Sequence, residues 1–269
     1  MTVMLEYLNY DFFVRAMIAV SLLSVCSAVI GTYIISRRLV AIAGGITHAC
    51  FGGLGLGYFL GVSPVAMAAV FAVGSSLGVE SMARRFQLRE DSAIAVIWAL
   101  GMALGVLFVF LTPGYVPELN AFLFGNILTV SQSDLWTFGA FAAVMAAFFL
   151  WKQKQIVAVA FDRDFAAVSG LPVRMINVAM TVLTAICIVL TIRMVGIMLL
   201  MSMMSLPMIS AEVFCNRFRP IAIVSAGISF VASMGGLFLS AAVDVPCSAL
   251  IVLILTAIFV VAKIAAAIR

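Results

Sequence analysis

Charged side chains are scarce in this sequence. Asp, Glu, Lys and Arg together make up 10% of its 269 residues, whereas hydrophobic residues make up 65%. Soluble globular domains usually carry about 25% charged residues and are about half apolar. No polar stretch is long enough to form a soluble domain, so we expect one transmembrane domain over residues 1–269. The composition excludes an ordinary soluble enzyme or binding module.

Three sequence patterns are also missing. There is no GxxxxGK[ST] phosphate loop, so work driven by a nucleotide must come from another polypeptide. The five cysteines include no CxxC pair, and we expect them to pack in apolar surroundings rather than form disulfides. The single histidine, His48, has no Ser or Asp beside it that would complete a hydrolase site. We therefore expect a protein that is not an enzyme and binds no cofactor stably.

Apolar runs of about 20 residues, each long enough to cross a bilayer as a helix, recur along the whole chain. They predict an all-α, polytopic membrane protein with about eight or nine transmembrane helices in the lipid bilayer. The predicted spans are 12–36, 39–61, 64–83, 93–112, 121–151, 173–192, 194–213, 220–240 and 246–266.

The basic residues fall on one side of this predicted arrangement, apart from Arg15 and Arg193. Because positively charged loops stay in the cytoplasm, that side is predicted to be cytoplasmic, with the C-terminus inside and the N-terminus outside. The net charge of +4 is spread over short loops, so we expect no nucleic-acid partner. The residues on the predicted cytoplasmic side are Arg37, Arg38, Arg84, Arg85, Arg89, Lys152, Lys154, Arg163, Arg174, Arg217, Arg219, Lys263 and Arg269.

The span predicted over 121–151 is too long for one straight helix. It contains the run Ser131-Gln132-Ser133-Asp134, whose short polar side chains compete for backbone hydrogen bonds. One interpretation is a broken or re-entrant helix, whose unpaired backbone must face protein or a water-filled cavity. The alternative is a simple loop between two short spans.

His48 lies in the second predicted span, about 15 Å from the basic pair Arg37-Arg38 and thus near the middle of a bilayer. An ionisable residue at that depth usually faces a transport path or the interior of a helix bundle. Neighbours one turn away on its row, Gly44 and Gly52, leave space around the ring. The alternative is a buried, neutral His48 that is hydrogen-bonded to a carbonyl.

A stripe of small residues runs along the same span. It recurs every four residues and predicts that another helix backbone packs closely against this one. The stripe consists of Gly45, Ala49, Gly53, Gly57 and Gly61.

The polar interval 161–174 predicts a short helix outside the membrane. Asp162 or Asp164 can cap its start, Gly170 can end it, and Pro172 prevents its continuation. Its apolar face, which includes Phe165, must be covered by lipid headgroups or by another protein. The alternative is a plain surface connector.

Four stretches carry a family resemblance: GGITHACFGGLGLGYFLG after Arg37-Arg38, AFLFGNILTVSQSDLW from Ala121, FDRDFAAVSGLPVR from Phe161, and RMVGIMLLMSMMSLP from Arg193. In this order, they resemble the membrane permeases of bacterial ABC importers for zinc, manganese and iron. The resemblance implies a type II ABC importer permease-like fold in the inner membrane. Its implied partners are a cytoplasmic ABC ATPase dimer, a second identical or related permease copy, and an extracytoplasmic metal-binding protein.

The resemblance also implies that residues 161–172 form the coupling helix that docks into the ATPase. The residues assigned to this contact are Phe161, Asp162, Phe165, Ala166, Val168, Gly170, Leu171 and Pro172.

The metal path implied by the resemblance departs from the family pattern in this chain. The family usually has an Asp four residues before the His and a Ser directly before it, where this chain has Gly44 and Thr47. One imidazole supplies fewer ligands than the three or four of ordinary zinc sites, but a two-fold dimer would bring two His48 rings to one path. We predict a transient metal site of His48, with Thr47, Cys50 and Glu212 as further candidates.

The implied cargo is a divalent metal ion, with zinc first and manganese or iron next. A permease for a larger chelate, such as haem, a siderophore or a cobalamin-like cofactor, is one alternative and would not need His48. An ion-coupled secondary transporter is the other, and it should carry charged pairs within its spans. The predicted spans contain few carboxylates, of which Glu80 lies near a helix end.

Overall fold

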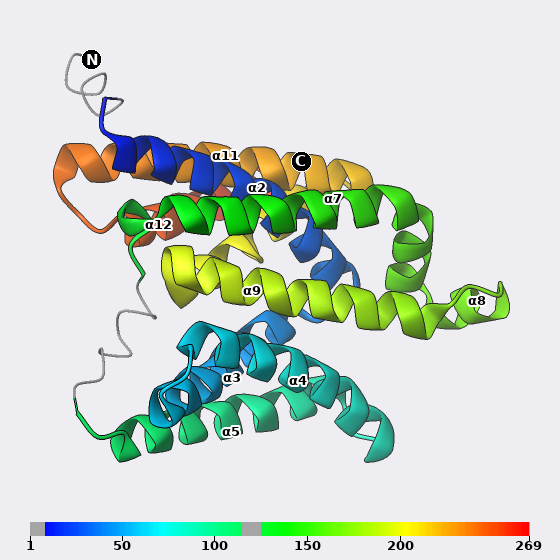
Figure 1. The fold of residues 1–269 in the computed structure, drawn as a ribbon. Coiled ribbons are helices and arrows are strands. Elements are labelled where there is room, and N and C mark those ends of the chain that lie inside the picture. Colours follow the sequence, from blue (N-terminus) through cyan, green and yellow to red (C-terminus); the bar gives the residue numbers. More distant parts are fainter. Residues whose placement is uncertain (1–8, 115–124, 269) are drawn as a thin grey trace. The chain divides into compact units, whose positions relative to one another are not determined.

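The structure is a computed structural model that describes residues 9–114 and 125–268. Over these residues the regular structure is helical (Figure 1). Eight described segments are long and apolar enough to cross a membrane, which confirms the predicted all-α, polytopic class. The elements are α2 (Asp11–Ser36), α3 (Val40–Leu60), α4 (Pro64–Arg85), α5 (Glu90–Leu111), η1 (Ile127–Thr129), α7 (Gln132–Phe161), α8 (Arg163–Val168), α9 (Val173–Met203), α10 (Leu206–Glu212), α11 (Phe218–Val243) and α12 (Cys247–Ala267).

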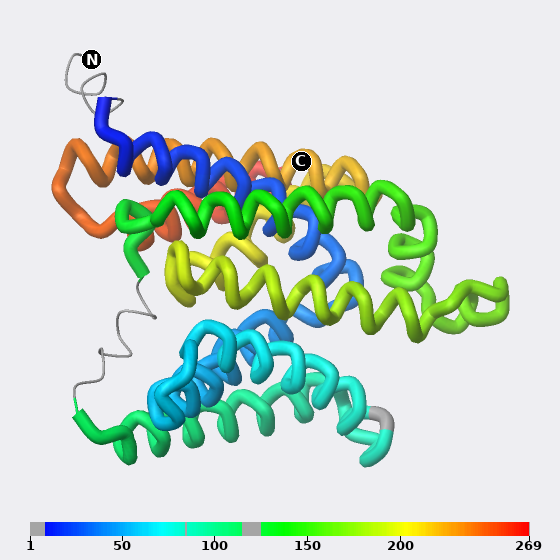
Figure 2. The backbone as a smooth tube through the Cα atoms, in the orientation of Figure 1, coloured from blue at the N-terminus to red at the C-terminus, as the bar shows by residue number. Residues whose placement is uncertain are grey.

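The chain divides into two compact units. The first comprises Met1–Ser36, Asn120–Trp151 and Met194–Arg269, and the second comprises Arg37–Leu119 and Lys152–Arg193. The first unit contains α2, near the start of the chain, and the late helices α11 and α12, which Figure 2 draws in blue, orange and red. Each unit is therefore assembled from segments that are distant in the sequence.

In the first unit, α2 packs along α11, and α10 contacts α2, α11 and α12. Buried serines lie in both long helices. The Ser24 hydroxyl donates a hydrogen bond to the Val20 carbonyl at 2.7 Å, and the Ser225 hydroxyl donates to the Ile221 carbonyl at 2.6 Å. Because each hydroxyl is satisfied within its own helix, these small side chains can be buried between helices at little cost.

In the second unit, α3 contacts both α4 and α5, and its glycines lie directly against their backbones. A Cβ added to Gly53 would lie 2.7 Å from the Cα of Ala68 in α4, and one added to Gly57 would lie 2.5 Å from the Cα of Pro64. The predicted close packing along the small-residue stripe is confirmed. Residues of α4 and α5 cover the stripe at Gly45, Gly53 and Gly57, whereas no described residue lies within 4 Å of a Cβ at Gly61. A second copy would therefore have to approach the covered part of α3 through another face.

The span predicted over 121–151 is wrong in its bounds. Residues 121–124 lie outside the described part of the chain, Gly125 to Ser131 contain only η1, and α7 begins at Gln132 and continues to Phe161. The Asp134 amide donates to the Ser131 hydroxyl at 3.2 Å, and the Ser131 amide donates to the Asp134 carboxylate at 3.2 Å. This reciprocal pattern is a capping box, so the polar run starts a helix rather than breaking one.

The two helices predicted over 173–192 and 194–213 are present, but the break between them lies at Gly196 and not at Arg193, because α9 (Val173–Met203) consists of two helices joined across a kink at Gly196. A long Arg side chain can reach polar surroundings while its backbone remains helical, so the charge does not end the helix. The kink lies at Gly196, whose φ of 78° and ψ of 173° belong to a region that glycine alone adopts readily. The two predicted spans 173–192 and 194–213 correspond to one candidate membrane segment, Val173–Glu212.

Candidate functional site

His48 lies on the side of α3 that faces α5. Its ring stacks on the ring of Trp98, with centroids 4.3 Å apart and planes 10° apart. Its Nδ1 lies 3.3 Å from the thioether sulfur of Met102, one turn further along α5. Both partners come from the same helix at a spacing of four residues, so α5 fixes the orientation of the imidazole.

The Met102 contact indicates which ring nitrogen of His48 carries the proton. A thioether sulfur accepts hydrogen bonds weakly and donates none, so in this contact the proton belongs on Nδ1 of His48. Neutral His48 then carries its lone pair on Nε2, which is the atom that would bind a metal ion. In this tautomer the ring can offer only one nitrogen, Nε2, to a further partner.

The other predicted metal ligands are less well placed. The Thr47 hydroxyl donates to the Ala43 carbonyl at 2.5 Å and is fully buried, and Cys50 is also buried. Glu212 belongs to the first unit, where it is exposed at the end of α10. Across residues 9–114 and 125–268, no group of three or more His, Cys, Asp or Glu side chains could hold a metal ion.

The first unit contains a cavity of about 690 Å³ where α2 begins, α11 ends and α12 begins. Asp244 and Cys247 line it together with Asn126 and Met198. Asp244 caps α11 in the left-handed conformation, with a φ of 56°. The cavity walls are mainly apolar side chains and backbone, and they offer space rather than a set of ligands.

The predicted helix in the interval 161–174 is confirmed as α8. The Asp162 carboxylate accepts a hydrogen bond from the Phe165 amide at 2.9 Å, which caps the start of the helix. Gly170, with a φ of 76°, follows its end. Ala166 is buried, whereas Phe165 and Val168 are 67% and 90% exposed. The helix therefore presents an apolar surface that the described residues of the second unit leave exposed.

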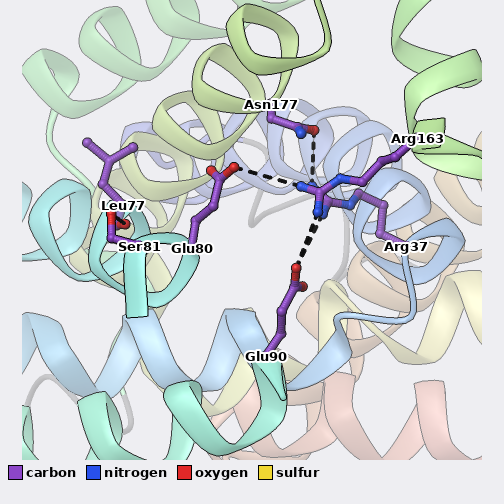
Figure 3. Close-up of polar contacts among 7 residues, drawn as sticks. All are labelled: Arg37, Leu77, Glu80, Ser81, Glu90, Arg163 and Asn177. Carbon is purple, nitrogen blue, oxygen red and sulfur yellow. Dashed lines mark hydrogen bonds and ion pairs between the residues drawn. The ribbon is translucent and has the colours of Figure 1, made fainter. Parts of the chain in front are cut away.

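A cluster of charges at α8 was not predicted from the sequence. Figure 3 shows Arg163 directed toward Glu80 and Glu90, with Arg37 beside it contacting Glu90 and Asn177. These residues come from α8, α4, α5, the α2–α3 connection and α9. They are up to 140 positions apart in the chain, and the basic residues in the loops indicated only a common side of the membrane, not these contacts.

The long apolar helices define a multi-pass membrane protein. The chain belongs to the ABC 3 transport family, whose model matches residues 9–266. It is thus the membrane permease component of an ABC transport system, which confirms that it is a non-catalytic subunit that works with a separate ATPase and a binding protein.

Two curated relatives are similar over nearly the whole chain. The manganese transport system membrane protein MntC of Halalkalibacterium halodurans is 29% identical over 258 residues, covering 96% of this chain and 88% of that protein. A protein of Haemophilus influenzae named for an iron transport system is 29% identical over 260 residues, covering 96% and 95%. The solved structure of PsaBC from Streptococcus pneumoniae with a Fab shares the fold, with a TM-score of 0.84, 24% identity and coverage of 96% and 94%.

Proposed function

We propose that this chain forms the membrane pathway of an ATP-driven importer for a divalent metal ion. The observation that carries the proposal is the similarity over nearly the full length to permeases named for manganese and iron transport. His48 adds a chemical reason, because it places one metal-binding nitrogen on α3 with its orientation fixed by Trp98 and Met102.

Manganese and iron are the first candidates for the cargo, ahead of the zinc that we expected from the sequence. No relative described above is named for zinc. The residues around His48 do not favour zinc over manganese or iron, because imidazole binds several divalent transition metals and affinity alone does not select among them. Delivery by the binding protein is then the step that selects the ion.

The pathway requires two permease copies, identical or related, with His48 as a transient relay. One imidazole per chain gives weak binding, which suits passage rather than storage. Because α4 and α5 cover the small-residue stripe of α3 at Gly45, Gly53 and Gly57, the two copies approach each other through surfaces other than this covered part.

The exposed apolar surface formed by Phe165 and Val168 of α8 and by Phe161, the last residue of α7, is the proposed docking site for the ATPase. In this proposal the α8 end of the second unit lies in the cytoplasm and the protein lies in a bacterial inner membrane. An N-terminus outside and a C-terminus inside require an odd number of crossings, and thus that the segment Val173–Glu212 crosses twice by turning at the Gly196 kink. Arg37, Glu90 and Arg163 lie in or next to three different loops, and their contacts bring these loops together. The positive-inside rule assigns all three loops to the cytoplasm, so the contacts support that assignment.

Uptake into proteoliposomes tests the proposal. Vesicles that hold this chain with its ATPase and binding protein should take up manganese or iron(II) when ATP is supplied, and vesicles with a non-hydrolysable analogue should not. Zinc is compared in parallel. A preparation that hydrolyses ATP but imports none of the three ions would contradict the proposal and point to a chelated or larger substrate.

A further inference from the structure

Arg163, the first residue of α8, is held by carboxylates from two different long helices. Its Nη1 donates to Oε1 of Glu90 at 3.3 Å, and its Nη2 lies 4.0 Å from Oε1 of Glu80 (Figure 3). Glu90 is the first residue of α5, and Glu80 lies in α4. The short helix is therefore tied to α4 and α5 through one side chain.

Glu90 extends this connection further. The same Oε1 that accepts from Arg163 also lies 3.8 Å from Nη2 of Arg37, which lies in the short connection between α2 and α3. Nη1 of Arg37 donates to Oδ1 of Asn177 in α9 at 3.3 Å. The Arg37 side chain is only 8% exposed, so its charge is largely withdrawn from water and depends on these partners.

The helices held by this cluster form a body that resists internal rearrangement. Gly101 and Gly105 of α5 pack directly on the backbone of Ala49 and Phe51 in α3, and Gly53 of α3 packs on that of α4. Backbone-to-backbone packing leaves no flexible side chain to absorb a displacement, so a force on α4 or α5 moves α3 as well. His48 and Trp98 move with this body.

We propose that Arg163 is the positioning residue that transmits movement of the docked ATPase from α8 to the α3–α5 body that carries His48. This rests on the proposed function, in which α8 binds the ATPase. Glu80 and Glu90 are the receiving groups, and Arg37 links them to the start of α3. Arg163 acts through these neighbours and does not itself touch the metal ion.

The Nε atom of Arg163 is what we expect at a contact that changes during the transport cycle. This atom is buried and has no hydrogen-bond partner among the described residues. A buried donor without a partner is uncommon in a settled structure. Together with the contact to Glu80 at 4.0 Å, this leaves room for a tighter arrangement in another state of the transport cycle.

The test replaces Arg163 in the assembled transporter. We expect Arg163→Gln to leave the ATPase bound and hydrolysing ATP, while the number of ions imported per ATP falls by about tenfold. Arg163→Glu should be worse, and the exchange Arg163→Glu with Glu80→Arg should recover part of the loss. The matched control is Arg89→Gln, because Arg89 forms an exposed pair with Asp91, with side chains 86% and 61% exposed.

Wild-type import per ATP in Arg163→Gln would overturn the inference. Loss of ATPase binding in this variant would overturn it too, because Arg163 would then belong to the docking surface. If the wild-type vesicles import no divalent ion, it is the proposed function that fails.

A second measurement does not depend on the cargo. A fluorescent dye is attached at Phe110→Cys in a Cys215→Ser background, since Phe110 is 87% exposed and the other native cysteines are buried. Addition of ATP should change the dye signal when Arg163 is present and not in Arg163→Gln. An equal change in both would overturn the inference whichever substrate the protein carries.

Discussion

Gly105 of α5 lies directly against the carbonyl group of Phe51 in α3. A Cβ placed on Gly105 would be 2.7 Å from the Phe51 oxygen, closer than real Cβ atoms approach. Phe51 lies about one turn after His48 in α3. The position of His48, the candidate metal ligand, therefore depends on how closely the backbones of α3 and α5 approach each other. Small residues allow that approach in membrane helices.

Replacing Gly105 with Ala should destabilise the protein by about 1–3 kcal/mol, because the added methyl group forces α3 and α5 apart. Thermal unfolding of the detergent-solubilised chain measures this. Gly74→Ala is the control, since nothing lies within 4 Å of a Cβ at Gly74, and removing a helical glycine there should stabilise by about 0.5–1 kcal/mol. Equal effects at the two glycines would show that the close contact does not matter.

Met102→Leu should weaken metal transport without unfolding the protein. Leucine fills a similar volume, so the stability change should stay below about 1.5 kcal/mol. The loss of the sulfur that accepts from Nδ1 of His48 should raise the KM for the imported ion about tenfold, as the ring loses its fixed orientation. Met175→Leu, at a methionine 62% exposed in α9, is the control. An unchanged KM in Met102→Leu would reject the positioning role.

His48→Gln tests the relay itself. The glutamine side chain is polar and of similar size, but it lacks the Nε2 lone pair that the Met102 contact leaves on the imidazole. Uptake should fall more than in Met102→Leu, while binding of the ATPase to α8 stays unchanged. Uptake at the wild-type rate and with the same metal preference would mean that His48 is a packed side chain rather than a relay.

Local signals in the sequence predicted much of the fold. The second predicted span, 39–61, matches α3, and the Asp162 cap and the Gly170 end of α8 follow from the side-chain and backbone preferences of those residues. The glycine stripe predicted close packing on α3 correctly. Each of these features depends on residues that are a few positions apart in the chain. Patterns in a single sequence predict structure over this short range.

The errors arose where one local signal had two meanings. Ser131 to Asp134 can interrupt a helix or start one, and only the observed hydrogen bonds distinguish the two. Arg193 looked like the end of a span, whereas Gly196 makes the kink. The contact between Arg163 and Glu90 joins residues 73 positions apart, and a single sequence carries no signal for such a pair.

Gly196→Ala should destabilise the protein by about 1–3 kcal/mol, since alanine does not tolerate a φ of 78° with a ψ of 173°. The backbone at the kink is also closely packed, because a Cβ added to Gly125 would overlap the backbone of Val195 and Gly196. Gly227→Ala, at an open position within α11, is the matched control. The melting temperatures of the two variants measure the difference in stability. A Gly196→Ala protein as stable as the control would show that α9 does not require this kink.

Val168→Asp should prevent the ATPase from binding the permease. Val168 is 90% exposed at the end of α8 and Phe165 is 67% exposed, so both side chains are available to a partner, and a carboxylate buried there without a counter-charge opposes binding. Phe165→Ala should cost about 2 kcal/mol of binding free energy, as expected when a buried aromatic anchor is removed. Co-purification of the ATPase with a tagged permease measures both effects.

Met175→Asp is the control for this surface, because Met175 is 62% exposed but lies in α9 outside the short helix. It should retain the ATPase. Since Val168 and Phe165 contribute little to the packing of the second unit, their variants should fold and melt like the wild type. Capture of the ATPase at the wild-type level by Val168→Asp would place the docking surface elsewhere, and the role of Arg163 as the link from that surface to α5 would then lose its starting point.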